Sequence, residues 1–174
     1  MNNTIDTLLT RTSCRQYTDQ MPSREDLESI CRAGLYAPTG KNTQCPVIVA
    51  VTNKAVRDRM SRLNAQVLGT SDDPFYGAPA VLLVLADKAL GLTPVEDGSL
   101  VMGNMMNAAH ALGLGSCWIN RAREVFNTDE GKALLKELGI EGDYLGIGNC
   151  IVGYRAAPAA APRPRKEGRV RWVE

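Results

Sequence analysis

The chain has 174 residues, which fits one domain that buries roughly 70% of the surface exposed in its unfolded state. Lys and Arg total 20 and Asp and Glu total 19, so the formal charge of +1 argues against a general nucleic-acid-binding protein. The five cysteines form no C-x-x-C pair, and the N-terminus contains Asp6 and Arg11 where a signal peptide would have an apolar core. We therefore expect a cytoplasmic protein with reduced thiols.

Helical and strand patterns alternate along the first 154 residues. Helices are predicted where apolar residues recur at helical spacing behind capping residues such as Thr4, Ser23 and Thr128. The predicted helices are residues 4–10, 23–36, 54–68, 97–112, 121–126 and 129–138. The predicted strands, which are short and almost continuously apolar, are residues 47–51, 80–86, 116–119 and 144–154. In the helix at 54–68, Arg57 is expected among the exposed charges.

Residues 11–17, RTSCRQY, are a candidate anion site. In an extended chain Arg11, Ser13, Arg15 and Tyr17 would point the same way, because strand side chains have a period of two. Two guanidinium groups beside a hydroxyl suit a phosphate, since each guanidinium presents a planar fork of donors. The alternative is an ordinary solvated strand edge.

The longest uncharged stretch runs from Gly98 to Asn120, in a protein that is 22% charged. The helix predicted at 97–112 is apolar or small on every side, which indicates that protein or lipid surrounds it. Lipid is unsuitable because Asn104, Asn107 and His110 interrupt any window of about 20 apolar residues. We expect this helix to be buried on nearly every side, with part of its cover supplied by a second subunit.

The final residues differ from the rest of the chain. RAAPAAAPRP, at 155–164, is punctuated by proline and cannot form a helix or a core of its own. We divide the chain into a folded domain, 1–154, and an extended arm, 155–174, whose Val170 and Trp172 we expect to dock on a sheet edge of a partner subunit. A nucleic-acid-binding tail is the disfavoured alternative, because the basic residues lack interleaved aromatic side chains. The positive charges of the arm are Arg155, Arg163, Arg165, Lys166, Arg169 and Arg171.

Familiar catalytic constellations are missing from the sequence. It contains no P-loop and no G-x-G-x-x-G after a strand. The single histidine, His110, lies inside the central helix and the cysteines are scattered, so we expect no metal site. A Cys–His nucleophilic pair is conceivable only with His110, which we interpret instead as a buried polar group. Asn64 is interpreted as a satisfied core amide. Without an acid–base constellation, the protein is either non-enzymatic or obtains its chemistry from a cofactor.

Several short motifs occur in a fixed order along nearly the whole chain. They are RTSCRQY at 11–17, APTGKNTQ at 37–44, DPFYGAP at 73–79, ALGLGSCWI at 111–119 and PRPRK at 162–166. In these motifs and their order the chain resembles the FMN-dependent nitroreductase family. The resemblance implies an α+β fold with a mixed, mainly antiparallel sheet of four or five strands flanked by helices. It also implies an intertwined homodimer with FMN at the interface.

The resemblance further implies which residues bind FMN. The phosphate and ribityl contacts fall on Arg11, Thr12, Ser13 and Arg15, with Arg163, Arg165 and Lys166 of the arm closing on the phosphate. The ring contacts fall on Pro38, Thr39, Gly40 and Asn42 from the other subunit, on Asn64, and on Leu114 and Gly115. The backbone N–H groups of the last pair would face the ring, and glycine would let the backbone approach it.

The implied function is a reductase that uses NADH or NADPH and passes electrons to a nitroaromatic, a quinone or a similar acceptor. Its cycle would be ping-pong, with no catalytic side chain. The alternative is a flavin-binding protein without turnover, such as a carrier, a sensor or an inactive relative. The chain departs from the family pattern at Gln44-Cys45-Pro46-Val47, where many members have Gln-Pro-Trp, and it lacks the insertions that cover the flavin in larger members.

Overall fold

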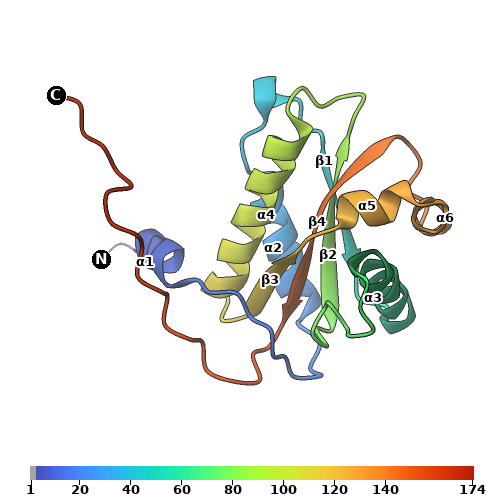
Figure 1. The fold of residues 1–174 in the computed structure, drawn as a ribbon, viewed down its shortest axis with the longest axis horizontal. Coiled ribbons are helices and arrows are strands. Elements are labelled where there is room, and N and C mark those ends of the chain that lie inside the picture. The colour runs from blue at the N-terminus through green and yellow to red at the C-terminus, as the bar shows by residue number, and fades with distance from the viewer. Residues whose placement is uncertain (1–2) are drawn as a thin grey trace.

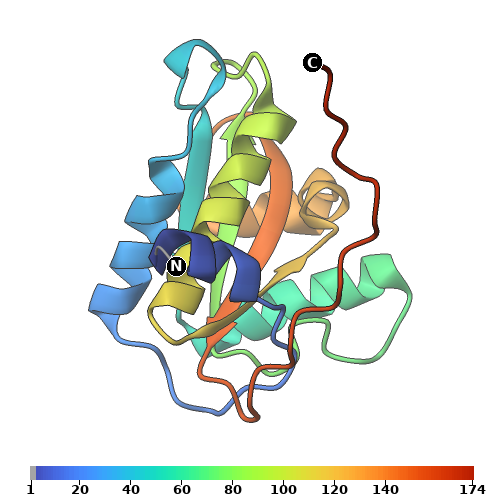
Figure 2. The same ribbon diagram turned by 90° about the vertical axis from the view of Figure 1, so that its left-hand side faces the viewer.

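The computed structural model describes residues 3–174 and shows an α+β fold built on one four-stranded sheet (Figures 1 and 2). The strand order is β1-β2-β4-β3, and each neighbouring pair is antiparallel. The strands are β1 (Pro46–Val51), β2 (Ala80–Asp87), β3 (Gly115–Ile119) and β4 (Tyr144–Gly153). The helices are α1 (Asn3–Thr10), α2 (Arg24–Leu35), the short 3₁₀ helix η1 (Gly40–Asn42), α3 (Lys54–Leu68), α4 (Pro94–Ala111), α5 (Ala122–Asn127) and α6 (Asp129–Glu137). The α+β prediction is confirmed, and within residues 3–174 the parallel pairing is limited to an isolated bridge between Ser13 and Ser116.

Helices cover both faces of the sheet (Figure 1). Helices α2 and α4 pack on one face, where Ile30 and Met105 are fully buried. Helices α3, α5 and α6 lie on the other face, where Met60 and Phe75 belong to the second core cluster. Strand β2 is buried throughout 80–86, because it lies inside the sheet with helices on both sides. This arrangement explains its continuous apolar run.

Capping residues set several helix boundaries as the sequence predicts. Ser23 Oγ accepts a hydrogen bond from the N–H of Asp26 at 3.0 Å, which confirms the start of α2. Thr128 Oγ1 caps α6 in the same way. Helix α1 already includes Asn3, so Thr4 lies in its first turn and not at an N-cap.

Strand β4 and helix α5 approach each other closely at Gly146. A Cβ atom at this position would lie 2.3 Å from the carbonyl oxygen of Ala122, the first residue of α5. Any side chain would therefore push the helix away from the strand. Glycine here fixes the start of α5, and with it the two residues that join β3 to α5, Asn120 and Arg121.

Helix α4 is buried on one side only. Met102 and Ala109 are fully buried toward the sheet, whereas Leu100 is 48% exposed and Val95 is 39% exposed. The single chain therefore covers one side of α4 and leaves an apolar stripe with Val95 and Leu100 open, and the expected cover of this stripe by a second subunit stays a prediction. Among the residues that the structure describes, no helix has the length and hydropathy needed to cross a membrane.

The arm leaves the end of β4 as extended chain and does not join the sheet (Figure 2). Residues 156–174 are exposed, including Trp172 at 85% and Val170 at 69%. An exposed tryptophan has no apolar cover within its own chain. Docking of the arm on a partner subunit stays a prediction.

Candidate functional site

Residues 11–17 are held against one end of the sheet by backbone pairing. The N–H of Cys14 donates to Ser116 O at 2.9 Å, next to the isolated parallel bridge between Ser13 and Ser116. A second, antiparallel bridge joins Tyr17 to Arg155. The segment therefore runs between the beginning of β3 and the residues that follow β4.

The side-chain alternation predicted for this segment holds only in part. Ser13 and Arg15 are exposed and Cys14 between them is buried, as a period of two requires. Tyr17 leaves this face, since its ring packs against the core and its hydroxyl donates to Cys14 O at 2.9 Å. Arg11 is half-buried. The structure thus presents Ser13 and Arg15 to solvent together and turns Arg11 partly into the protein.

Arg11, Thr12, His110 and Arg155 form a cationic cluster, in which the charges of both arginines act on the histidine. Arg155 Nη2 donates to Thr12 O at 2.9 Å. His110 near the end of α4 belongs to the same cluster, with its Nε2 2.8 Å from Thr10 Oγ1. Burial, and then the charges of Arg155 and Arg11, lower the pKa of His110. The cluster therefore disfavours any additional positive charge.

The cationic cluster has unsatisfied hydrogen-bonding capacity. Arg11 Nη1 and Thr12 Oγ1 are buried and have no hydrogen-bond partner. Across residues 3–174, neither Arg11 nor Arg155 forms an ion pair with a carboxylate. A buried polar atom without a partner costs about 1–3 kcal/mol, which makes such atoms uncommon. A phosphate group would supply both the oxygen atoms and the negative charge that are missing, so these residues fit a phosphorylated ligand.

A cavity of about 460 Å³ lies at the other end of β3. Its volume falls within the range of about 300–1,000 Å³ that is usual for small-molecule sites. Trp118 on its wall has a buried indole N–H without a partner. The residues that line the cavity include Val95, Ser99, Trp118, Asn120, Arg121 and Ile147.

Asn64 fixes the rim of this cavity. It is 2% exposed, and its Nδ2 donates to Asn120 O at 2.8 Å. The interpretation of Asn64 as a satisfied core amide is confirmed. The next residue, Arg121, has φ 76°, a left-handed conformation that is uncommon for a non-glycine residue and clusters at functional sites. Sequence analysis missed Asn120 and Arg121, although two polar residues directly after an apolar strand were a usable signal.

The loop between α2 and β1 packs against the beginning of α4. The N–H of Gly40 donates to Asp97 Oδ1 at 2.9 Å. Non-glycine residues in left-handed conformations store backbone strain that the surrounding contacts must maintain. The residues of this loop with positive φ are Lys41 at 51°, Asn42 at 56° and Gln44 at 51°.

This loop and residues 11–17 lie at opposite ends of α4 (Figure 1). Asp97 contacts the loop near one end of the helix, and His110 contacts Thr10 near the other. At 1.5 Å per residue, the helix between these two contacts spans about 20 Å. Within one chain, the structure therefore does not bring Pro38–Asn42 together with the cationic cluster.

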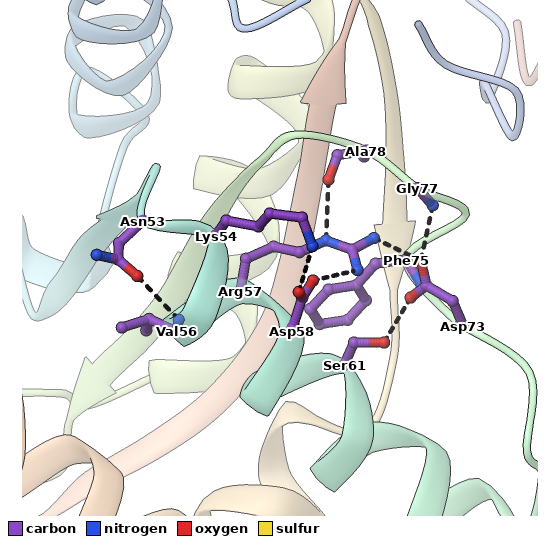
Figure 3. Close-up of polar contacts among 10 residues, drawn as sticks. All are labelled: Asn53, Lys54, Val56, Arg57, Asp58, Ser61, Asp73, Phe75, Gly77 and Ala78. Atoms are coloured by element: carbon purple, nitrogen blue, oxygen red, sulfur yellow. Dashed lines mark hydrogen bonds and ion pairs between the residues drawn. The ribbon is translucent and has the colours of Figure 1, made fainter. Parts of the chain in front are cut away.

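A buried arginine organises the turn at 73–79 (Figure 3). Arg57 is 8% exposed, and it donates from Nε to Ala78 O at 3.0 Å and from Nη2 to Asp73 at 2.5 Å. The other donors to Asp73 are the hydroxyl of Ser61 and the N–H groups of Phe75 and Gly77. The prediction that Arg57 is exposed is wrong, because the turn supplies acceptors that satisfy its guanidinium inside the protein.

The same turn presents Tyr76 to Arg15. Tyr76 has φ 53° and is 44% exposed, and Arg15 Cζ lies 6.0 Å from the centroid of its ring. This distance is at the limit of a cation–π contact. The network around Arg57 holds the turn that carries Tyr76, and it therefore also positions the Tyr76 ring beside the exposed guanidinium of Arg15.

Comparison with known proteins identifies the family. The model of the Nitroreductase family matches residues 8–74 and 66–154. The chain belongs to the nitroreductase family. A curated relative from Archaeoglobus fulgidus, named "Putative NADH dehydrogenase/NAD(P)H nitroreductase", is 30% identical over 171 residues, which cover 96% of this chain and 90% of the relative.

Other members of the nitroreductase family extend the comparison. A crystal structure of a nitroreductase with bound FMN from Bacteroides fragilis matches with a TM-score of 0.90 and 26% identity, over 100% of both chains. An FMN reductase [NAD(P)H] from Bacillus subtilis is 26% identical, over 95% of this chain and 70% of the relative. The chain spans 59%, 56% and 55% of the length of three further curated relatives.

The residues implied by the family resemblance fall into separate places in this nitroreductase-family chain. Arg11, Thr12, Ser13 and Arg15 lie together on the segment at the beginning of β3, whereas Asn64 lies at the cavity rim. Pro38, Thr39, Gly40 and Asn42 lie at the far end of α4. Arg163, Arg165 and Lys166 are exposed on the arm, apart from the other groups.

One of the backbone donors that the resemblance assigns to the flavin ring already has a partner within the chain. The N–H of Leu114 donates to Ala109 O at 2.8 Å, and its side chain is 1% exposed. The end of α4 therefore uses the donor that was assigned to a flavin ring. Gly115 is required by packing within the chain, because a Cβ there would lie 2.7 Å from Cys14 and 2.9 Å from Arg155 Cγ.

Proposed function

We propose that this chain is an FMN-dependent oxidoreductase that uses NADH or NADPH as its reductant. The observation that carries the proposal is the cationic cluster, with its unpaired Arg11 Nη1 and Thr12 Oγ1, in a chain of the nitroreductase family. The FMN bound in the Bacteroides fragilis relative supports the choice of ligand. The phosphate of FMN would supply the acceptors that the cluster lacks, through charge-assisted hydrogen bonds.

The two ends of β3 would hold the two ends of the cofactor. Arg11, Thr12, Ser13 and Arg15 would contact the phosphate and the ribityl chain. The cavity beside Asn120 would take the ring, with Asn64 keeping that carbonyl in place. When bound, FMN would accept hydride from NADH or NADPH and pass two electrons to a nitroaromatic, a quinone or a similar acceptor in alternating half-reactions.

The cysteines of the chain are poor candidates for a nucleophile. All five are free thiols, and Cys31 is the one that is not fully buried. Burial raises the pKa of the Cys31, Cys45 and Cys150 thiols, and hydrogen bonding to Asp97 raises that of Cys45 further. A raised pKa disfavours the reactive thiolate at neutral pH. The protein would therefore contribute position and electrostatics, and the cofactor would contribute the chemistry.

We also propose that a second copy of the chain completes the site. The separation of about 20 Å along α4 supports a contribution of Pro38–Asn42 to the site of the partner. The open apolar stripe of α4 and the exposed arm supply surfaces for such a dimer. In such a dimer, the exposed arm would lie across the partner subunit. Only there would Arg163, Arg165 and Lys166 reach the phosphate of a bound FMN.

The test starts with the purified protein. We expect a flavin absorbance spectrum, release of FMN and not FAD on denaturation, and steady-state oxidation of NADH or NADPH when a quinone is added. A protein that binds FMN without turnover would support the carrier or sensor alternative. A colourless protein that gains no flavin on incubation with FMN would refute the proposal.

A further inference from the structure

Arg155 lies where the end of β4 meets the segment at 11–17. Its backbone pairs with Tyr17, and the N–H of the following Ala156 donates to Gln16 O at 3.0 Å. These contacts place Arg155 in the folded domain, in contrast to the other cations of the arm. Its side chain is half-buried, whereas all residues after it are exposed.

The path of the Arg155 side chain is fixed by two contacts. Its Cγ passes over Gly115, where a Cβ would lie only 2.9 Å away, so only glycine leaves room for it. Its Nη2 donates to Thr12 O at 2.9 Å. One of the five donors of a guanidinium is thereby used, and the others remain for a ligand. The packing therefore places the guanidinium of Arg155 at Thr12, the residue that follows Arg11 in the sequence.

The charges around Arg155 are unbalanced. The described part of the chain gives ion-pair partners to Arg24, Arg57 and Arg59, but none to Arg155 or Arg11. The charges of both guanidinium groups act on His110, and neither group has a carboxylate to balance it. The geometry thus favours a doubly charged anion at this position.

We infer that Arg155 is a phosphate-binding residue of the cofactor site, in which its guanidinium and that of Arg11 bind the terminal phosphate of a flavin mononucleotide. This inference rests on the proposed function. It assigns phosphate recognition to a residue of the folded domain, before any contribution from Arg163, Arg165 and Lys166. The carbonyl of Thr12 orients the guanidinium of Arg155 for this contact.

The deciding experiment compares FMN with riboflavin, which lacks the phosphate. Dissociation constants are measured by flavin fluorescence for the wild type, Arg155→Gln, Arg155→Lys and the control Arg24→Gln, which removes an exposed cation paired with Glu28. We expect Arg155→Gln to weaken FMN binding about 10-fold or more, since a charge-assisted hydrogen bond contributes about 1.5–3 kcal/mol. Riboflavin affinity should change less than about twofold, Arg155→Lys should retain part of the FMN preference, and Arg24→Gln should change neither affinity.

Two results would overturn the inference. One is an unchanged FMN affinity in Arg155→Gln. The other is an equal loss for FMN and riboflavin, which would show that Arg155 only supports the fold. If the wild type bound neither flavin, the proposed function would fail, and a titration with inorganic phosphate would still decide the role of Arg155.

That titration uses His110, the single histidine of the chain, as a reporter. Thr10 contacts its ring, and the charges of Arg155 and Arg11 act on it. Its ring-proton resonances give the pKa directly by NMR. We expect inorganic phosphate or FMN to raise the pKa of His110 in the wild type, because a nearby anion favours the charged imidazolium, and to raise it less in Arg155→Gln. If neither ligand changed the pKa of His110, or if the change were equal in the wild type and in Arg155→Gln, the result would contradict the inference.

Discussion

Asp97, in the first turn of α4, accepts a hydrogen bond from the backbone N–H of Gly40, 57 residues away in the sequence. The carboxylate is 2% exposed, and it also accepts from Thr93 Oγ1 at 3.0 Å and from Cys45 Sγ at 3.4 Å. There is no room for a side chain at position 40, where a Cβ would lie 2.5 Å from Thr93 Oγ1. One buried carboxylate thus joins the strained loop to the central helix.

Replacement of this carboxylate should loosen the loop. In Asp97→Ala the half-buried N–H of Gly40 and the buried thiol of Cys45 lose their acceptor, and each unsatisfied donor costs about 1–3 kcal/mol. We expect a lower free energy of unfolding, measured by urea denaturation of the apoprotein. The control Glu96→Ala removes the exposed neighbouring acid and should stay within about 0.5 kcal/mol of the wild type. An equal free energy of unfolding for Asp97→Ala and Glu96→Ala would show that the hydrogen bonds to Asp97 do not stabilise the fold.

Asp73 should make the stability depend on pH in the acid range. Burial raises the pKa of Asp73, but hydrogen bonds from Arg57, Ser61 and the backbone of the turn outweigh it, and the net result is a pKa below the ordinary 3.8. A carboxyl with a lowered pKa stabilises the fold above its unfolded-state pKa, and this contribution is lost as pH falls through the folded-state pKa. We expect Asp73→Asn to have a lower Tm than the wild type at pH 7, with the difference shrinking below about pH 4.

The control for this comparison is Asp72→Asn, at the exposed adjacent residue. Its Tm should follow that of the wild type across the pH range. A constant difference between Asp73→Asn and the wild type from pH 7 to pH 3 would mean that the Asp73 charge plays no part.

Arg15 should contribute to FMN affinity without supporting the fold. It is exposed, and its one described contact is with the ring of Tyr76. We expect Arg15→Ala to weaken FMN binding roughly 10-fold or more in a flavin-fluorescence titration, with the Tm of the apoprotein unchanged. Arg15→Lys, which keeps the charge but loses the planar fork, should lie between the two. Unchanged affinity in Arg15→Ala would remove Arg15 from the site.

Removal of the arm should weaken both the dimer and the cofactor site. A chain that stops after Ala157 keeps Arg155 and its contact with Thr12, so the loss can be assigned to residues 158–174. We expect weaker dimerisation and weaker FMN binding, measured by light scattering with absorbance detection. A full-length chain with Arg163, Arg165 and Lys166 changed to Gln should lose FMN affinity but keep its dimer. A yellow, full-strength dimer without the arm would contradict the exchange of arms.

The sequence by itself determined the local elements and the family. Ser23 and Thr128 marked helix starts because their side chains cap the backbone within the next three residues, and the apolar run of β2 marked a buried strand. The order of the short motifs indicated the family, because each motif is a contiguous stretch. These signals are short-range, and they do not depend on how distant segments pair.

The tertiary structure alone decided which of these elements meet. Arg155 lies beside Thr12, 143 residues away, because the strand order β1-β2-β4-β3 places the end of β4 next to the beginning of β3. Helical periodicity placed Arg57 outside, whereas the turn at 73–79 folds over it and supplies its acceptors. Periodicity describes the faces of one element, and it contains no information on the register between strands or on the path of a distant loop. That register put Arg155, and not only the motif residues Arg11 and Arg15, at the candidate phosphate site.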